Sequence, residues 1–191
     1  MKKLVYLLAA TVMIGTPSCK KIAQIADTTF SAPYSQKVNI PTDPSHPYGE
    51  ALPAGGIDLL FESVDMPTNS QQYFDEYHVS GKNIKSTSME SGELTIVSGA
   101  ERNFDYLDKI EVYISAESLP EVLVAYQNNI PKGSNKITLI SAGQNLRQYV
   151  RKPIVTGRVK AHVNTIPKPG GSLNVNAEFN VIANALVNYD K

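Results

Sequence analysis

Apolar and polar residues alternate along most of this chain, which is the pattern of β-strands with one buried face. The segment 109–115 is the simplest case, because Ile110, Val112 and Ile114 all fall on one side of it. Pro33 lacks a backbone donor, so the strand that contains it is predicted at the edge of a sheet. Eight or nine strands are predicted, over residues 29–40, 57–63, 84–89, 94–97, 109–115, 121–126, 137–140, 154–164 and 173–186.

Only short helical pieces interrupt this pattern. A capped helix is predicted over 69–77, with shorter pieces over 103–107 and 144–150. Residues 41–56 are rich in proline and glycine and are predicted as a long loop. Because there is no strand–helix repeat, a parallel sheet is not expected. We predict an all-β fold, a two-sheet antiparallel β-sandwich of immunoglobulin-like style with two or three short helical pieces.

The end of the chain has the most regular alternation. Residues 154–164 and 173–186 are joined by a loop rich in proline and glycine, so they are predicted to form a hairpin with one buried side. Its outer face would carry cations and asparagines, although asparagine is depleted in strands. Such a face could hydrogen-bond sugars or phosphates, or be an ordinary solvated surface. The candidate binding residues are Arg158, Lys160, His162, Asn174, Asn176 and Asn180.

The first nineteen residues have the order of an export signal. Two lysines follow Met1, an uncharged apolar run extends over 4–15, and small residues precede Cys19. A basic start, an apolar stretch of this length and a small-residue exit are typical of a secretory signal. The run is shorter than the roughly 20 apolar residues that cross a bilayer. We predict a signal peptide over 1–18, a tether over 19–28 and one domain over 29–191.

This leader resembles that of bacterial lipoproteins, in which the cysteine after the signal is acylated and becomes the new N-terminus. Cys19 is the only cysteine in the chain, so it cannot form an internal disulfide. The resemblance implies lipidation at Cys19, membrane attachment and a location in the bacterial cell envelope, on the periplasmic or surface face of the outer membrane. The alternative is an ordinary secretory signal, which would leave a free thiol at the same position.

Charge is divided between two parts of the sequence. From Asp43 to Glu121 there are fifteen acids and four bases, whereas residues 122–177 hold eight bases and no acid. Such an asymmetry can mark a surface for polyanions or membranes. It is also explained if strands of the two segments lie side by side and form cross-strand ion pairs, which is the interpretation we favour. Nothing in this balance points to nucleic acid as a partner.

Candidate chemistry is sparse. His46, His78 and His162 do not have the spacing of a metal site, and no nucleophile motif is present. We therefore predict no catalytic residue, metal or cofactor. The chain also resembles small all-β lipoproteins as a type, which assigns no residue roles.

The favoured hypothesis is a non-enzymatic envelope lipoprotein that binds or assembles with a protein, a glycan or an anionic headgroup through sheet faces or loops. One alternative is a carrier of a small hydrophobic or cofactor-like ligand between the sheets, in a pocket lined by Phe179, Val175 and Val159. The other is an envelope hydrolase. That function would require a cleft with converging carboxylates or a histidine of shifted pKa.

Overall fold

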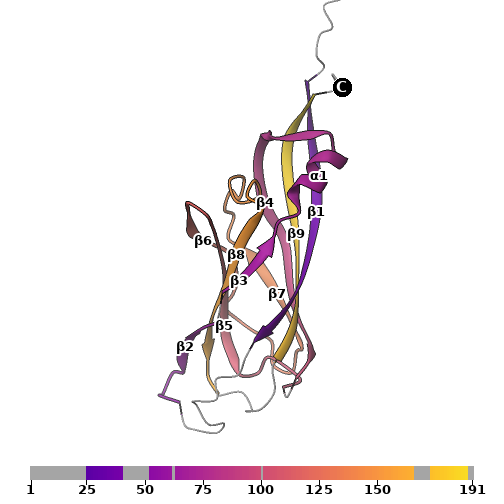
Figure 1. The fold of residues 1–191 in the computed structure, drawn as a ribbon. Coiled ribbons are helices and arrows are strands. Elements are labelled where there is room, and N and C mark those ends of the chain that lie inside the picture. The colour runs from indigo at the N-terminus through magenta and orange to yellow at the C-terminus, as the bar shows by residue number, and fades with distance from the viewer. Residues whose placement is uncertain (1–24, 41–51, 62, 100, 166–172, 189–191) are drawn as a thin grey trace, which may run out of the picture.

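The computed structural model describes residues 25–40, 52–61, 63–99, 101–165 and 173–188, which form an elongated and almost entirely β structure (Figure 1). The all-β class is therefore confirmed. The elements are β1 (Ile25–Ile40), β2 (Ile57–Leu60), β3 (Val64–Pro67), α1 (Ser70–Glu76), β4 (Val79–Ser98), β5 (Leu107–Ala116), β6 (Leu119–Gln127), β7 (Lys136–Ser141), β8 (Ile154–Val163) and β9 (Leu173–Asn188).

Hydrogen bonds join the nine strands into one sheet with the order β1-β9-β4-β7-β6-β5-β8-β2, and β3 pairs with β8 beside β2. All of these pairs are antiparallel. β1 lies at one end of this order, which confirms the edge position predicted from Pro33. β7 joins the two parts of the sheet, because residues 136–139 pair with β4 whereas Ile140 and Ser141 pair with β6.

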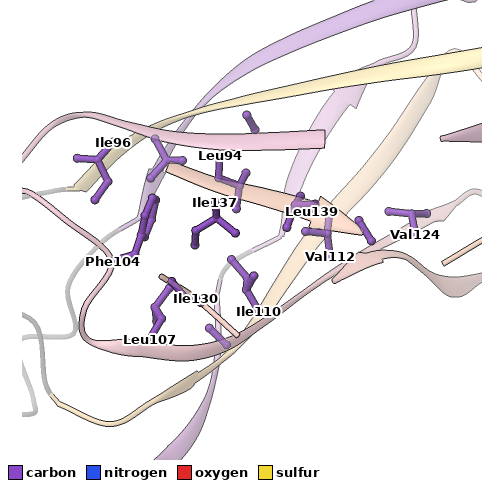
Figure 2. Close-up of a cluster of buried hydrophobic side chains, with 14 of the residues drawn as sticks. Leu94, Ile96, Phe104, Leu107, Ile110, Val112, Val124, Ile130, Ile137 and Leu139 are labelled. Atoms are coloured by element: carbon purple, nitrogen blue, oxygen red, sulfur yellow. The ribbon is translucent and has the colours of Figure 1, made fainter. Parts of the chain in front are cut away.

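The main core forms where distant strands of this sheet face one another. Figure 2 shows Leu94 of β4, Ile137 of β7 and Ile110 of β5 directed into one cluster. Ile137 is fully buried. A second cluster is centred on Phe30 and lies beside α1. Burial of a large aliphatic side chain contributes roughly 1.5–3 kcal/mol, so these inward residues hold the curved sheet together.

The predicted hairpin of β8 and β9 is wrong. β8 pairs with β2, β3 and β5, whereas β9 lies between β1 and β4. The alternation correctly identified both strands, since it depends only on local sequence. It could not identify their neighbours, because one buried face is compatible with many pairings.

Two further expectations need correction. Segments 84–89 and 94–97 are parts of the single strand β4, which stays paired with β9 through register shifts such as the one between Met89 and Ser91. The described residues contain one helix, α1, rather than two or three. Residues 103–107 and 144–150 form isolated turns, as in the hydrogen bond of 2.9 Å from the Leu107 amide to the Phe104 carbonyl.

β1 begins at Ile25, four residues before the predicted start and inside the segment expected to be a tether. Its first residue pairs with Asn188 at the end of β9. The predicted signal peptide and Cys19 lie outside the described residues. Among those that are described, no helix has the length and apolar character needed to cross a membrane.

A candidate ligand pocket

A pocket of about 270 Å³ is lined by residues of β1, β3, β4, β5, β6, β8 and β9. The start of α1 and the turn near Leu146 close one end. Some of the residues around it, such as Pro33 and Asn69, are exposed, so the pocket reaches the surface beside the edge strand β1.

Most of the pocket wall is apolar. Met89 of β4, Val112 of β5 and Phe179 of β9 contribute to it from three different strands. The Phe179 ring lies close to the backbone of β4, where a Cβ atom at position 92 would be 3.0 Å from a ring carbon. Gly92 therefore allows the ring to pack against this strand. The result is a surface suited to hydrocarbon or aromatic groups.

Of the three residues predicted to line such a pocket, Phe179 does so. Val175 is buried in the main core, and Val159 packs against that core. The interior is therefore filled around Val175, whereas Phe179 packs against the main core and also lines the pocket.

Thr87 is the exceptional residue in this wall. It is 1% exposed, and its hydroxyl has no hydrogen-bond partner within the described residues. Its backbone is satisfied, since its amide donates to Asn145 Oδ1 at 3.2 Å and its carbonyl accepts from the Leu146 amide at 2.7 Å. A buried hydroxyl without a partner costs about 1–3 kcal/mol. The Thr87 hydroxyl is therefore a polar group in the pocket lining that has no partner among the described residues.

Tyrosines and amides form the rim of the pocket on the β1 side. The Tyr34 hydroxyl donates to Gln36 Oε1 at 3.4 Å, and the Tyr73 hydroxyl of α1 donates to the Pro33 carbonyl at 2.9 Å. Burial raises the pKa of Tyr34, so its hydroxyl stays protonated at physiological pH. The bond from Tyr73 fixes the helix to the edge strand at the rim.

Sequence reasoning missed Thr87. Met89 is two positions further along the strand, with Ser88 between them, so the side chains of Thr87 and Met89 point to the same face of β4. A register shift between Ile84 and Ser86 changes which face is inward, and that shift is visible only in the pairing with β9. The only signal in the sequence was that the hydroxyl-bearing Thr87 is two positions from Met89, so that both share one face of a strand.

The predicted cationic residues of β8 are already paired with acids. Arg158 forms an ion pair with Glu121, and Lys160 Nζ lies 2.8 Å from Asp58 Oδ2. His162 Nδ1 lies 2.9 Å from the other carboxylate oxygen of Asp58. Hydrogen bonds from Lys160 and His162 lower the pKa of Asp58 to about 2. Lys160 and His162 thus hold β2 on β8, and Arg158 joins β8 to β6, instead of presenting free charge.

The asparagines of β9 are part of a hydrogen-bonded ladder across three strands. Asn180 accepts a bond of 2.5 Å from the Ser31 hydroxyl of β1 and donates one of 2.5 Å to Glu90 of β4. Asn184 is bonded in the same way to Thr29 and Ser86. Cross-strand satisfaction of this kind explains why asparagine occurs here against its propensity.

Asn176 accepts a hydrogen bond from Ser35 at 3.2 Å and donates one to Glu178 at 2.7 Å. Asn174 lies opposite Asn39 and Ser98 in the strand register. Because β8 and β9 are not neighbours, the six predicted binding residues do not form one face.

Part of the charge asymmetry of the sequence is explained by pairing across the fold. Five ion pairs join acids of the segment 43–121 to residues of 122–177, and for Lys136, Lys160 and His162 the two partners lie on paired strands, as the cross-strand interpretation predicts. The five pairs are Lys132–Asp108, Lys136–Glu93, Arg158–Glu121, Lys160–Asp58 and His162–Asp58.

Metal-binding side chains do not gather in the part of the chain that the structure describes, where no group of three histidine, cysteine, aspartate or glutamate residues is placed to hold an ion. His46 lies outside that part. His78 is exposed, with a positive φ of 53°.

Comparison with known proteins gives no functional assignment. No protein-family model and no curated protein matches the sequence. The structure has a weak likeness to two viral structures. One is that of the infectious bursal disease virus Gt strain, with a TM-score of 0.30, 11% identity and coverage of 96% of this chain and 42% of the other.

The second is the VP2 subviral particle of infectious bursal disease virus, with a TM-score of 0.27, 11% identity and coverage of 85% and 33%. This chain thus spans less than half the length of either viral chain. At these scores the likeness does not extend to a shared function.

Proposed function

We propose that this protein is a non-enzymatic, lipid-anchored protein of the bacterial envelope that binds a small, mainly apolar ligand in the pocket around Thr87. The observation that carries the proposal is an apolar cavity of about 270 Å³ with one buried hydroxyl that has no partner in the described residues. Ligand pockets typically measure roughly 300–1,000 Å³, so the expected ligand is a single ring system or a short acyl group. Its polar atom would hydrogen-bond to Thr87.

The architecture supports this function if β7 separates two layers of a sandwich. β1, β4 and β9 would then form one layer and β3, β5, β6 and β8 the other. Inward residues from both parts of the sheet meet in one core, which is the arrangement that sandwiches use. A pocket between layers is enclosed by rigid strands, so its shape is fixed before the ligand arrives.

The other hypotheses have less geometric support. Of the residues predicted as a binding face, Asn176, Asn180 and the three cations of β8 are bonded to neighbouring side chains, so a partner would have to displace those bonds. His162 has the shifted pKa expected of a hydrolase, but Asp58 and the Gly55 carbonyl occupy its two ring nitrogens. It is also absent from the pocket lining. Ligand binding is therefore the function that we favour.

A dye titration tests the pocket. N-phenylnaphthylamine, an apolar dye whose fluorescence rises in apolar surroundings, would be titrated into the mature chain. Ala32 lines the pocket, so Ala32→Trp should fill its mouth and weaken dye binding by about tenfold. Lys37→Trp places the same ring on the exposed side of β1 and serves as the matched control. Equal binding by both variants and the unmodified protein would overturn the proposal.

The anchor needs a separate measurement. The intact mass of the protein purified from its native membrane should include acyl chains, and Cys19→Ala should remove both that added mass and the membrane retention. An unmodified chain in the soluble fraction would show that the protein is secreted freely. That outcome would not affect the pocket.

A further inference from the structure

Two arginine side chains converge on the first residues of β4. The Arg151 guanidinium donates from Nε to the Gly81 carbonyl at 2.6 Å and from Nη2 to the Lys82 carbonyl at 3.1 Å. Arg147 Nη2 also donates to the Lys82 carbonyl, at 3.4 Å. Because both guanidinium groups share one acceptor, two positive charges are held within a few ångströms of each other.

No acid neutralises this arginine pair within the described residues. Neither arginine forms an ion pair there, and Arg147 Nε is buried without an acceptor. Partial burial and the charge of Arg147 lower the pKa of Arg151, which nevertheless remains charged. Like charges held this close together favour an anion that bridges them.

Further cations lie close to the pair. Lys82 is exposed and supplies the shared carbonyl, and Lys152 follows Arg151 directly in the sequence. Lys85 forms an ion pair with Asp27 at the same end of the sheet. Asp75 of α1 accepts a hydrogen bond of 2.8 Å from Gln71. Among the described residues at this end of the sheet, Arg147 and Arg151 are therefore two neighbouring cations for which no carboxylate forms an ion pair.

The strand register places the pair at the end of the molecule where β1 begins. Val79 is opposite Val187 and Ile84 is opposite Ala185, so residues 80–83 lie level with the last residues of β9. Ile25, the first residue of β1, is opposite Asn188. Figure 1 shows the same arrangement, with the start of β4 and α1 near the beginning of β1.

This end also faces the proposed anchor. Ile25 comes six positions after Cys19, and the five residues between them include Lys20 and Lys21. A fully extended chain advances by about 3.3–3.6 Å per residue, so these positions reach about 20 Å at most. A lipid on Cys19 would hold the arginine pair close to the bilayer surface.

We propose that Arg147 and Arg151 bind the phosphate of an anionic lipid headgroup and so orient the domain on its membrane. Guanidinium groups are well suited to phosphate because their donors match its oxygens in pairs. The identity of the surface rests on the proposed anchor, whereas the anion site rests on the two arginines themselves. With this contact, the pocket opening beside β1 would have a fixed position relative to the membrane.

Vesicle binding tests this inference with the complete mature chain carrying Cys19→Ala, so that no acyl group contributes. Sedimentation with phosphatidylcholine vesicles would be compared with sedimentation in which phosphatidylglycerol is added. The chain should bind only the anionic vesicles, and Arg147→Gln with Arg151→Gln should weaken binding by about tenfold or more. Lys82→Gln should cause a smaller loss of vesicle binding, because it removes one charge and leaves the Lys82 carbonyl that both arginines contact.

The matched control is Lys132→Gln with Lys136→Gln. It makes the same charge change at the other end of the sheet, where Lys136 is opposite Thr95 of β4. Equal weakening by the control, or undiminished binding by the arginine variant, would overturn the inference. If inorganic phosphate binds to the protein through the two arginines while anionic vesicles do not bind, the ligand is a free anion instead of a lipid headgroup. Dye binding in the pocket, measured on the same variants, distinguishes this failure from failure of the proposed function.

Discussion

His162 and Asp58 form an ion pair between β8 and β2, with 2.9 Å between the imidazole Nδ1 and the carboxylate Oδ1. The second ring nitrogen, Nε2, lies 2.5 Å from the carbonyl oxygen of Gly55. Both nitrogens face acceptors, and only the imidazolium form can donate to both. The hydrogen bond to Asp58, together with that to Gly55, raises the pKa of His162 above its usual 6.5. The segment around Gly55 is thus held by a charge that depends on pH.

The stability contributed by His162 should decrease as the pH rises. The folded pKa exceeds the unfolded one, so the stabilisation is fully present below about pH 6.5 and is lost as pH increases through the folded value. We expect the difference in unfolding free energy between the unmodified protein and His162→Gln to shrink over this interval in urea denaturation. A difference that is constant with pH would contradict the assignment. Asp58→Asn should lower the pKa of His162, as followed by NMR.

Asp58 should contribute most to a separate loss of folding stability at acidic pH. Hydrogen bonds from Lys160 and His162 lower its pKa from 3.8 to about 2. Its stabilisation is therefore present above about pH 3.8 and is lost as pH falls towards 2. Asp58→Asn should flatten the loss of stability in that range. Glu117→Gln, at an exposed turn residue, is the control and should leave the acid limb unchanged.

Thr87→Val should stabilise the ligand-free protein by about 1 kcal/mol, because it removes a buried hydroxyl without a partner in the described residues. It should also weaken ligands that carry a hydrogen-bonding atom more than it weakens purely apolar dyes. Thr95→Val is the matched control on the same strand, since the Thr95 hydroxyl donates to Glu93 at 3.1 Å. Urea denaturation that shows Thr87→Val to be the more destabilising change would refute the prediction.

The asparagine ladder predicts coupling between strands at opposite ends of the chain. The Ser31 hydroxyl donates to Asn180 Oδ1 at 2.5 Å, and this bond joins β1 to β9. A double-mutant cycle with Ser31→Ala and Asn180→Ala should give a coupling of about 0.5–1 kcal/mol. Ser88, exposed on β4, gives a reference: Ser88→Ala with Ser31→Ala should be additive. Additivity in both cycles would mean that the ladder bond does not contribute.

Much of the fold could be predicted from local sequence. The spacing of Ile110, Val112 and Ile114 located β5, and the missing donor of Pro33 placed β1 at an edge. These inferences succeeded because a strand's two faces and a proline's missing amide are properties of a few adjacent residues. The division of β4 failed for a related reason. Gly92 and its neighbours interrupt the pattern in the sequence but remain paired with β9.

The candidate site was predictable only in part. An apolar pocket near Phe179 was anticipated as an alternative, whereas Val175 is buried in the core and Val159 packs against that core, outside the pocket lining. Whether inward side chains meet or leave a space depends on volumes contributed by several strands at once. Arg147 and Arg151 were counted as part of a basic segment, but their convergence on the Lys82 carbonyl required the turn after β7 to lie beside β4.

The sequence by itself determined the class of the fold, the positions of most strands and, where no register shift interrupts a strand, the face on which each side chain lies. Tertiary structure decided which strands are neighbours, and therefore which polar side chains have hydrogen-bond or ion-pair partners. Asn180 and His162 found partners from distant segments, whereas Thr87 found none among the described residues. The physical reason is that alternation within a strand is local, but pairing is chosen by burial and hydrogen bonding summed over the whole chain.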